Sequence, residues 1–285
     1  MRILDVSKYQ STIDYAKVAT QIDGVVLRCG YTGWGTANEC NVDTTFEKHY
    51  AGFKAAGVPV GVYYYSAVDT INGAKREAEF CKQLLTGKQF ELPIYYDVEN
   101  GERMNKLTKE QLTSQVIAWC DIMEQAGYFV GVYSYTSFFN ARLNVNELVQ
   151  RYSIWLADYR ANYDRTISRD MHQYTSTATI AGISGGVDMS NLFRTDLISI
   201  ITTKGFNGYP SKEVPPSNLK IAVIGPVSNG DKISVEALGQ KLGVSVNSTS
   251  RTDGLFDLTT SPMSEGDIIA FENLANQLQV GFTTR

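Results

Sequence analysis

The sequence of 285 residues lacks several features that identify common classes of protein. No apolar run reaches the roughly 20 residues of a membrane-spanning helix, and residues 1–5 contain no signal-peptide core, so we expect neither a membrane partner nor an export signal. Only two histidines are present, and the four cysteines show no C-x-x-C spacing, so we expect no metal site and no cofactor. The net charge of −4 argues against a nucleic-acid partner.

Aromatic residues are unevenly distributed along the chain. Of the 32 aromatic residues, only Phe256, Phe271 and Phe282 lie beyond residue 217. The segment before this boundary is rich in Gly, Pro, Lys and Ser, a composition typical of linkers. We therefore expect a large module over residues 1–198, a linker over 199–217 and a small module over 218–285.

The large module alternates short apolar runs with amphipathic stretches. Eight runs predict strands, at residues 2–7, 25–30, 58–66, 92–99, 128–134, 152–159, 170–175 and 185–189. Helical patterns separate several of them, at residues 42–57, 73–85, 108–127 and 137–150. Apolar strands separated by helices are typical of a parallel sheet that is buried on both faces. The predicted fold is α/β, an irregular (β/α)8-like barrel, with an open doubly wound sheet as the alternative.

The small module has its own pattern of elements. It predicts an α+β domain in the order β-α-β-β-α-β, and it contains no His or Cys. We therefore expect no catalytic residue in it. A domain of this size gains stability from self-association, so we also expect a homo-oligomer.

Acidic residues occur near the ends of three predicted strands. Asp5 lies on the first strand, Asp97 and Glu99 on the fourth and Asp188 on the last. The carboxyl ends of barrel strands carry active sites, and residues two apart on a strand point the same way, about 6–7 Å apart. Repulsion between confined carboxylates raises the pKa of one of them, which suits acid-catalysed cleavage of a glycosidic bond. Alternatively, these acids cap helices or pair with Arg28.

Aromatic side chains gather near the same strand ends. A flat ring with a polar tip suits the apolar face and the hydroxyl edge of a sugar, although each ring alone also fits ordinary packing. The same grouping includes Trp34, Tyr135 and Tyr159. The predicted substrate-binding residues are Arg28, Tyr31, Tyr63, Tyr65, Tyr133, Trp155 and Tyr174.

These motifs, taken together, resemble the glycoside hydrolase family 25 muramidases. The resemblance covers about residues 1–198 and rests on DVS with Gln10, then VVLRCGYTGWG, GVYYYS, YYDVE, GVYSY, IWLADY and HQYTSTATIAGISGGVDMSNLF, in this order. It implies an irregular β/α barrel. The sequence departs from the family pattern at His172, where Trp is common, and at Asn191, which follows the last acid by three residues instead of two.

The resemblance also implies a chemistry for the acids. Glu99 would be the general acid/base, Asp97 would assist the acetamido group of the substrate, and Asp5 and Asp188 would complete an acidic floor. The implied reaction is hydrolysis of the β-1,4 bond between N-acetylmuramic acid and N-acetylglucosamine in peptidoglycan. A retaining route is expected and an inverting one stays open. The alternatives are a catalytically silent glycan-binding protein and a hydrolase of another acetamido-sugar polymer.

The modular plan of phage endolysins suggests roles for the remaining parts by analogy. Residues 218–285 are predicted to bind a cell-wall carbohydrate, with oligomerisation as the alternative. We further expect a phage- or prophage-encoded enzyme that accumulates in the host cytoplasm before lysis and then acts on the cell wall.

Overall fold

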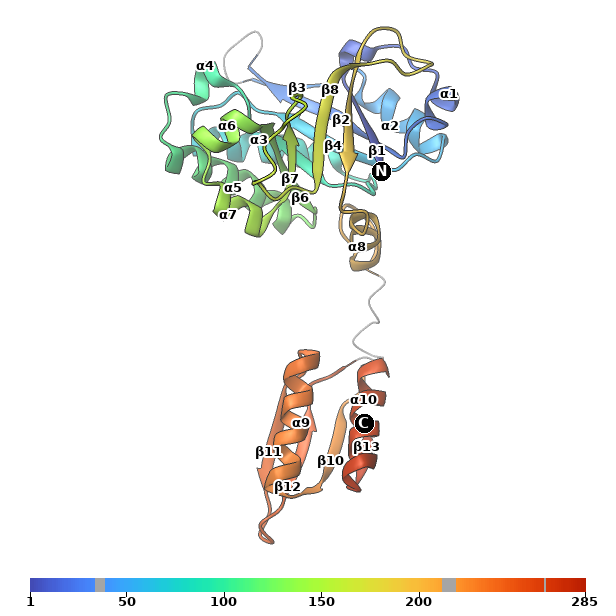
Figure 1. The fold of residues 1–285 in the computed structure, drawn as a ribbon, viewed down its shortest axis with the longest axis vertical. Helices are drawn as coiled ribbons and strands as arrows, with labels where there is room; N and C mark the ends of the chain where they lie inside the picture. The colour runs from blue at the N-terminus through green and yellow to red at the C-terminus, as the bar shows by residue number, and fades with distance from the viewer. Residues whose placement is uncertain (34–38, 212–218, 264) are drawn as a thin grey trace. The chain divides into compact units, whose positions relative to one another are not determined.

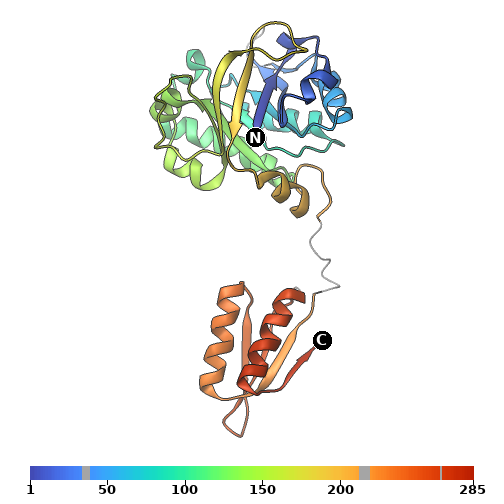
Figure 2. The same cartoon turned by 45° about the vertical axis from the view of Figure 1, so that its right-hand side comes forward.

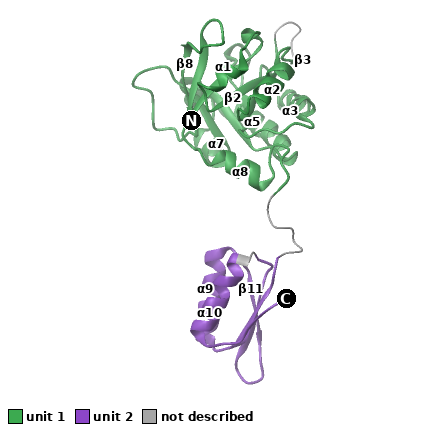
Figure 3. Cartoon of the chain, turned by 90° about the vertical axis from the view of Figure 1, so that its right-hand side faces the viewer, with its two compact units in different colours: residues 1–212 green, residues 213–285 purple. Residues whose placement is uncertain are grey.

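The computed structural model, drawn in Figure 1, describes residues 1–33, 39–211, 219–263 and 265–285. The chain divides into two compact units, residues 1–212 and 213–285 (Figure 3). Trp34 and the end of the predicted linker lie outside the described residues. Among the helices that are described, none combines the length and apolarity needed to cross a membrane.

The first unit is a closed barrel. Its strands hydrogen-bond in the order β1-β9-β8-β7-β6-β5-β4-β2, and β1 also pairs with β2, which closes the ring. The strands are β1 (Arg2–Val6), β2 (Gly24–Thr32), β4 (Val60–Tyr65), β5 (Ile94–Asp97), β6 (Val130–Tyr135), β7 (Ser153–Ala157), β8 (Met171–Ala178) and β9 (Val187–Leu192). All eight predicted strands and the α/β barrel are confirmed. A short strand that the sequence pattern did not reveal, β3 (Cys40–Val42), pairs antiparallel with β2.

The direction of the last barrel strand differs from the prediction. β9 runs antiparallel to both of its neighbours, β8 and β1, so the expectation of an entirely parallel sheet is wrong here. The connection formed by residues 179–186 is too short for the helical crossover that a parallel pair requires. Asp188 therefore lies near the amino-terminal end of its strand, where it pairs in register with Asp5 of β1.

Helices surround the barrel (Figures 1 and 2). Helix α5 begins with a capping box, in which the Thr108 side chain accepts from the Gln111 N–H and the Gln111 side chain accepts from the Thr108 N–H. The helix predicted over 137–150 is instead two helices, because Leu143 and Asn144 leave helical geometry and the Asn144 N–H donates to the Thr113 hydroxyl. The helices of this unit are α1 (Tyr15–Ala19), α2 (Phe46–Ala55), α3 (Ile71–Leu85), α4 (Gly101–Met104), α5 (Lys109–Gln125), α6 (Thr136–Arg142), α7 (Val145–Arg151) and α8 (Leu197–Lys204), with a 3-10 turn at Lys8–Gln10.

Strand alternation separates two apolar cores in the barrel unit. Outward-facing side chains pack against the helices, whereas an inner cluster that includes Ile3, Tyr95 and Met171 fills the barrel. Two residues further along the same inner faces, Asp5, Asp97 and Gln173 follow these three apolar residues. The apolar filling therefore stops below one end of the barrel, and polar side chains line that end.

The predicted linker starts too early. Helix α8 buries Leu197 and Ile201, and the fully buried Asn207 donates to the Leu92 carbonyl at 2.9 Å and accepts from the Phe129 N–H at 2.8 Å. The apolar spacing in residues 197–201 indicates this helix. The linker was nevertheless predicted to begin at residue 199, because the residues that follow are rich in Gly and Pro.

The second unit is a four-stranded antiparallel sheet with two helices on one face (Figure 2). Its core contains Ile224, Leu258 and Phe271. The elements are β10 (Ala222–Val227), α9 (Asn229–Leu242), β11 (Val246–Ser250), β12 (Phe256–Thr260), α10 (Glu265–Leu278) and β13 (Phe282–Thr284), with sheet order β11-β12-β10-β13. The predicted element order is confirmed, and self-association stays a prediction.

Candidate active site

Four carboxyl groups line one cavity of about 210 Å³ at the polar end of the barrel. Asp5 and Asp188 face each other across the β1–β9 pair, Asp97 ends β5, and Glu99 follows two residues later. These are the four acids predicted from the sequence, and the structure brings them together although they are remote in the chain. We call this space the acid cavity.

Burial raises the pKa of all four carboxyl groups, and repulsion from a neighbouring acid adds to this effect for Asp5, Asp97 and Glu99. Burial, followed by the charge of Asp188, raises the pKa of Glu99 to about 7. Burial and Glu99 raise the pKa of Asp97 well above its usual value, and the Arg28 cation opposes this effect. Burial and Asp188 also raise the pKa of Asp5, and burial raises that of Asp188. Glu99 can therefore hold a proton up to about neutral pH, as a general acid must.

Gln173 on β8 connects the acids to the neighbouring tyrosines. Its Nε2 donates to Asp5 Oδ2 at 3.1 Å, and its Oε1 accepts from the hydroxyls of Tyr133 at 2.9 Å and Tyr159 at 2.7 Å. Sequence reasoning missed this residue because a single amide within a strand carries no chemical signature. The alternation from Met171, which fills the barrel, was the available signal.

Three predicted aromatic residues line the acid cavity, namely Tyr63, Tyr133 and Trp155. The buried Trp155 donates from Nε1 to Ser190 Oγ at 3.0 Å, and its ring lies 4.4 Å from that of Tyr133, centroid to centroid. The indole is thus held by β9 and in turn supports the Tyr133 ring.

Arg28 lies beside the acid cavity without pairing directly with its acids. Its ion-pair partner is Asp43, which accepts from Arg28 Nε at 2.7 Å, and its Cζ lies 5.1 Å from the centre of the Tyr31 ring. Arg28 nevertheless lowers the pKa of Asp97 through its charge. The alternative in which the acids form ion pairs with Arg28 is therefore not what the structure shows.

The two remaining predicted residues lie in different surroundings. Tyr65 pairs in register with Asp97, its hydroxyl lies 3.4 Å from Asn100 Nδ2, and burial and Asp97 raise its pKa to about 12. Tyr174 packs against the core between sheet and helices, because residue 174 points out of the barrel when Gln173 points in. The structure therefore does not bring Tyr174 to the acids.

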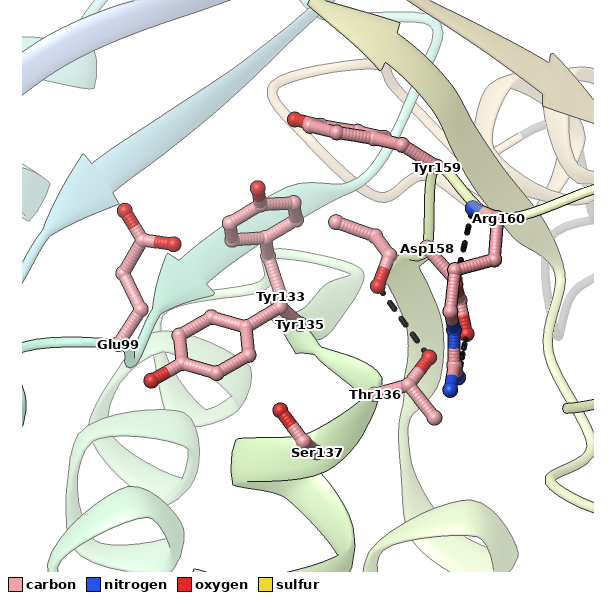
Figure 4. A pocket seen from close by; sticks show the side chains of 9 residues that line it. Glu99, Tyr133, Tyr135, Thr136, Ser137, Asp158, Tyr159 and Arg160 are labelled. Atoms are coloured by element: carbon pink, nitrogen blue, oxygen red, sulfur yellow. Dashed lines mark hydrogen bonds and ion pairs between the residues drawn. The ribbon is translucent and has the colours of Figure 1, made fainter. Parts of the chain in front are cut away.

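A second cavity of about 480 Å³ adjoins the first (Figure 4). We call it the side cavity. It shares Glu99, Tyr133 and Tyr159 with the acid cavity, so Glu99 lies where the two meet. The rest of its lining consists of Tyr135, Thr136, Ser137, Ala157, Asp158 and Arg160. Within the described part of the chain, no group of three or more His, Cys, Asp or Glu residues is arranged to hold a metal ion.

Comparison with known proteins identifies the family. The model for glycosyl hydrolases family 25 matches residues 4–183. The chain belongs to this family, and it is a glycoside hydrolase of the lysozyme type.

Several relatives extend this comparison. The autolytic lysozyme of Clostridium acetobutylicum is 24% identical over 280 residues, which cover 96% of this chain and 73% of that protein. The modular autolysin LytC of Streptococcus pneumoniae is 30% identical with a TM-score of 0.58, and the match covers 66% of this chain and 46% of LytC. This chain thus matches about half the length of LytC. The catalytic domain of endolysin ply40, from bacteriophage P40 of Listeria monocytogenes, shares the fold at 24% identity and a TM-score of 0.58, covering 73% of this chain and 97% of that domain.

Proposed function

We propose that this chain hydrolyses the β-1,4 bond between N-acetylmuramic acid and N-acetylglucosamine in bacterial peptidoglycan. One observation carries the proposal: Glu99, whose pKa is about 7, lines both the acid cavity and the side cavity. A glycan that places one sugar in each cavity brings the bridging oxygen to this carboxyl group. The names of the relatives, an autolytic lysozyme and an autolysin, support peptidoglycan as the substrate.

The acids divide the chemistry between them. Glu99 donates its proton to the bridging oxygen as the bond to the anomeric carbon breaks. Asp97 accepts a hydrogen bond from the acetamido N–H, so that the acetamido oxygen attacks the anomeric carbon. The Glu99 carboxylate then removes a proton from the water that opens this intermediate, and the configuration is retained. In support, Asp97 Oδ1 is buried without a hydrogen-bond partner among the described residues, which leaves it available as an acceptor.

The variant Glu99→Gln tests this proposal, since an amide cannot supply the proton. We expect loss of lysis in a turbidity assay, with an unchanged circular dichroism spectrum and retained glycan binding. The matched control is Glu102→Gln, which alters an exposed carboxylate in helix α4 and should keep full activity. Full activity of Glu99→Gln would remove Glu99 from its role.

Product analysis separates the remaining alternatives. Muramic acid at the new reducing ends is expected, and glucosamine there would assign cleavage to the other glycosidic bond. Retention at the anomeric carbon, measured by NMR during early turnover, is expected from the acetamido route, and inversion would contradict it. Binding without cleavage would indicate a silent glycan-binding protein.

For the second unit we propose anchoring to a cell-wall carbohydrate. Its separate core supports a module that folds independently, and the modular construction of LytC supports the analogy. We further propose that the chain is a phage- or prophage-encoded endolysin that accumulates in the host cytoplasm and acts at the wall. The fold shared with a phage endolysin domain supports this role. Release of the protein only upon induced lysis of its host would test it, and earlier secretion would refute it.

A further inference from the structure

One arginine side chain, that of Arg160, lies among the described residues that line the side cavity. Of the described residues that line it, Arg160 alone carries a positive charge, and 66% of its side chain is exposed. Figure 4 shows Arg160 next to Asp158 on the wall opposite Glu99. This arginine lies beyond β7 and has no part in the acid chemistry described above.

A buried carboxylate fixes the orientation of this arginine. Arg160 Nε donates to Asp158 Oδ1 at 2.8 Å and Nη2 donates to Oδ2 at 2.5 Å, while the Asp158 side chain is only 3% exposed. The hydrogen bonds from Arg160 hold the pKa of Asp158 well below its usual range, so the pair is charged at every pH at which the enzyme is assayed. Two hydrogen bonds along one edge of the guanidinium hold it in a defined position.

The other edge of the guanidinium remains available to a ligand. Nη1 donates to no residue within the described ranges, and Nη2 has a second N–H that Asp158 does not use. These two nitrogens form a planar fork that matches the two oxygens of a carboxylate. The hydroxyl-bearing side chains of Tyr135 and Ser137 line the same cavity and suit the adjoining sugar.

We propose that Arg160 binds a carboxylate carried by a muramyl residue of the bound glycan. This inference rests on the proposed function. When N-acetylmuramic acid occupies the acid cavity, the side cavity takes N-acetylglucosamine, which has no carboxylate, so the carboxylate that Arg160 binds comes from a muramyl residue bonded to that N-acetylglucosamine. Two groups supply the same chemistry: a carboxylate of the peptide stem, and the lactyl carboxylate that removal of the stem exposes. Arg160 thereby makes the enzyme prefer anionic strands to neutral acetamido-sugar polymers.

The test compares three substrates: strands with peptide stems, strands stripped of stems by an amidase, and stripped strands whose lactyl carboxylates are esterified. We expect Arg160→Ala to raise KM about tenfold more on the strands that carry the recognised carboxylate, either stem-bearing or stripped, than on the esterified strands. The value of kcat should change little. Arg160→Lys should restore part of the difference, since it keeps the charge but loses the fork. The control Arg151→Ala removes an ion pair with Asp121 outside both cavities and should leave all three KM values unchanged.

A second variant guards against local unfolding. Arg160→Ala leaves Asp158 buried without its cation, so the double variant Asp158→Asn/Arg160→Ala removes both charges and should show the same preference loss. A rise in KM confined to stem-bearing strands would show that Arg160 binds the stem carboxylate. A rise in KM confined to stripped strands would show that it binds the lactyl carboxylate. Equal rises on all three substrates, or none on any, would overturn the proposal.

Binding measurements keep this inference separate from the catalytic one. In the Glu99→Gln background, calorimetry on the same strands reports affinity without turnover. If the unmodified protein cleaves none of the strands but still binds them in a way that depends on Arg160, only the proposed function is overturned. Normal cleavage with binding that is insensitive to Arg160 would overturn the carboxylate site alone.

Discussion

A buried carboxyl group away from the acid cavity makes stability depend on pH. Glu77, on helix α3, is fully buried, and its Oε2 accepts from the hydroxyls of Tyr96 at 2.5 Å and Ser66 at 2.9 Å. Burial raises its pKa to about 7, and these hydrogen bonds only partly offset the effect. The folded protein therefore binds this proton more tightly than the unfolded chain does.

The size of the effect follows from the two pKa values. The folded pKa is about 7 and the ordinary value is 4.5, and each pH unit between them corresponds to about 1.4 kcal/mol. Because the folded state binds more protons in this window, the free energy of unfolding falls as pH rises from about 4.5 and levels off above about 7. Glu77 alone should account for about 3 kcal/mol of this decrease.

The variant Glu77→Gln isolates this contribution, since an amide of the same shape does not ionise. Urea unfolding between pH 4.5 and 8 is followed by tryptophan fluorescence, and all three tryptophans lie in the first unit, so the signal reports the barrel. The stability of the variant relative to the unmodified chain should increase by about 3 kcal/mol across this range. The control Glu79→Gln alters an exposed carboxylate on the same helix, which pairs with Lys82. The stability of this control relative to the unmodified chain should stay nearly constant across the pH range.

The raised pKa of Glu77 would be refuted if the difference in free energy of unfolding between Glu77→Gln and the unmodified chain did not change with pH. A change of opposite sign would show that the Tyr96 and Ser66 hydroxyls stabilise an ionised carboxylate more than burial destabilises it.

The remaining predictions concern the active site and the second unit. Asp97→Asn should lower kcat roughly 100-fold with little change in KM, and a defect in KM alone would restrict Asp97 to binding. The value of kcat/KM should fall as pH rises through about 7, because Glu99 must keep its proton. Asp188→Asn should move this decline to lower pH, because the charge of Asp188 raises the pKa of Glu99, and an unchanged profile would contradict the coupling. Removal of residues 213–285 should reduce co-sedimentation with cell walls roughly tenfold while hydrolysis of soluble glycan persists, and unchanged co-sedimentation would refute anchoring.

The sequence predicted the barrel because its strands are buried on both faces and so form continuous apolar runs. It also predicted the four acids, because Asp97 and Glu99 lie two residues apart at the end of a predicted strand and Asp5 and Asp188 lie on the first and last predicted strands. The direction of β9 was not predicted, since it depends on the length of a connection and on ring closure. Asp188 reaches the site because of that reversed direction.

Single-residue assignments failed where the signal was weak. Tyr174 was predicted to bind substrate, but Gln173 lines the acid cavity instead, because an error of one residue along β8 turns a side chain to the opposite face. Arg160 was not identified because an exposed arginine after a strand has no distinctive pattern. Its importance arises only from the cavity formed where β6 and β7 lie side by side.

The pairing of Asp5 with Asp188 has a consequence for biosynthesis. These residues meet where the first and last strands of the barrel pair, so the hydrogen bonds between β1 and β9 also complete the group of four acids. A nascent chain that has not yet emerged from the ribosome through residue 192 lacks that pairing. We therefore expect activity to appear only when synthesis of the barrel is nearly complete. A single cleavage of the chain within residues 179–186 that releases β9 should abolish activity, although all four acidic residues remain in the protein.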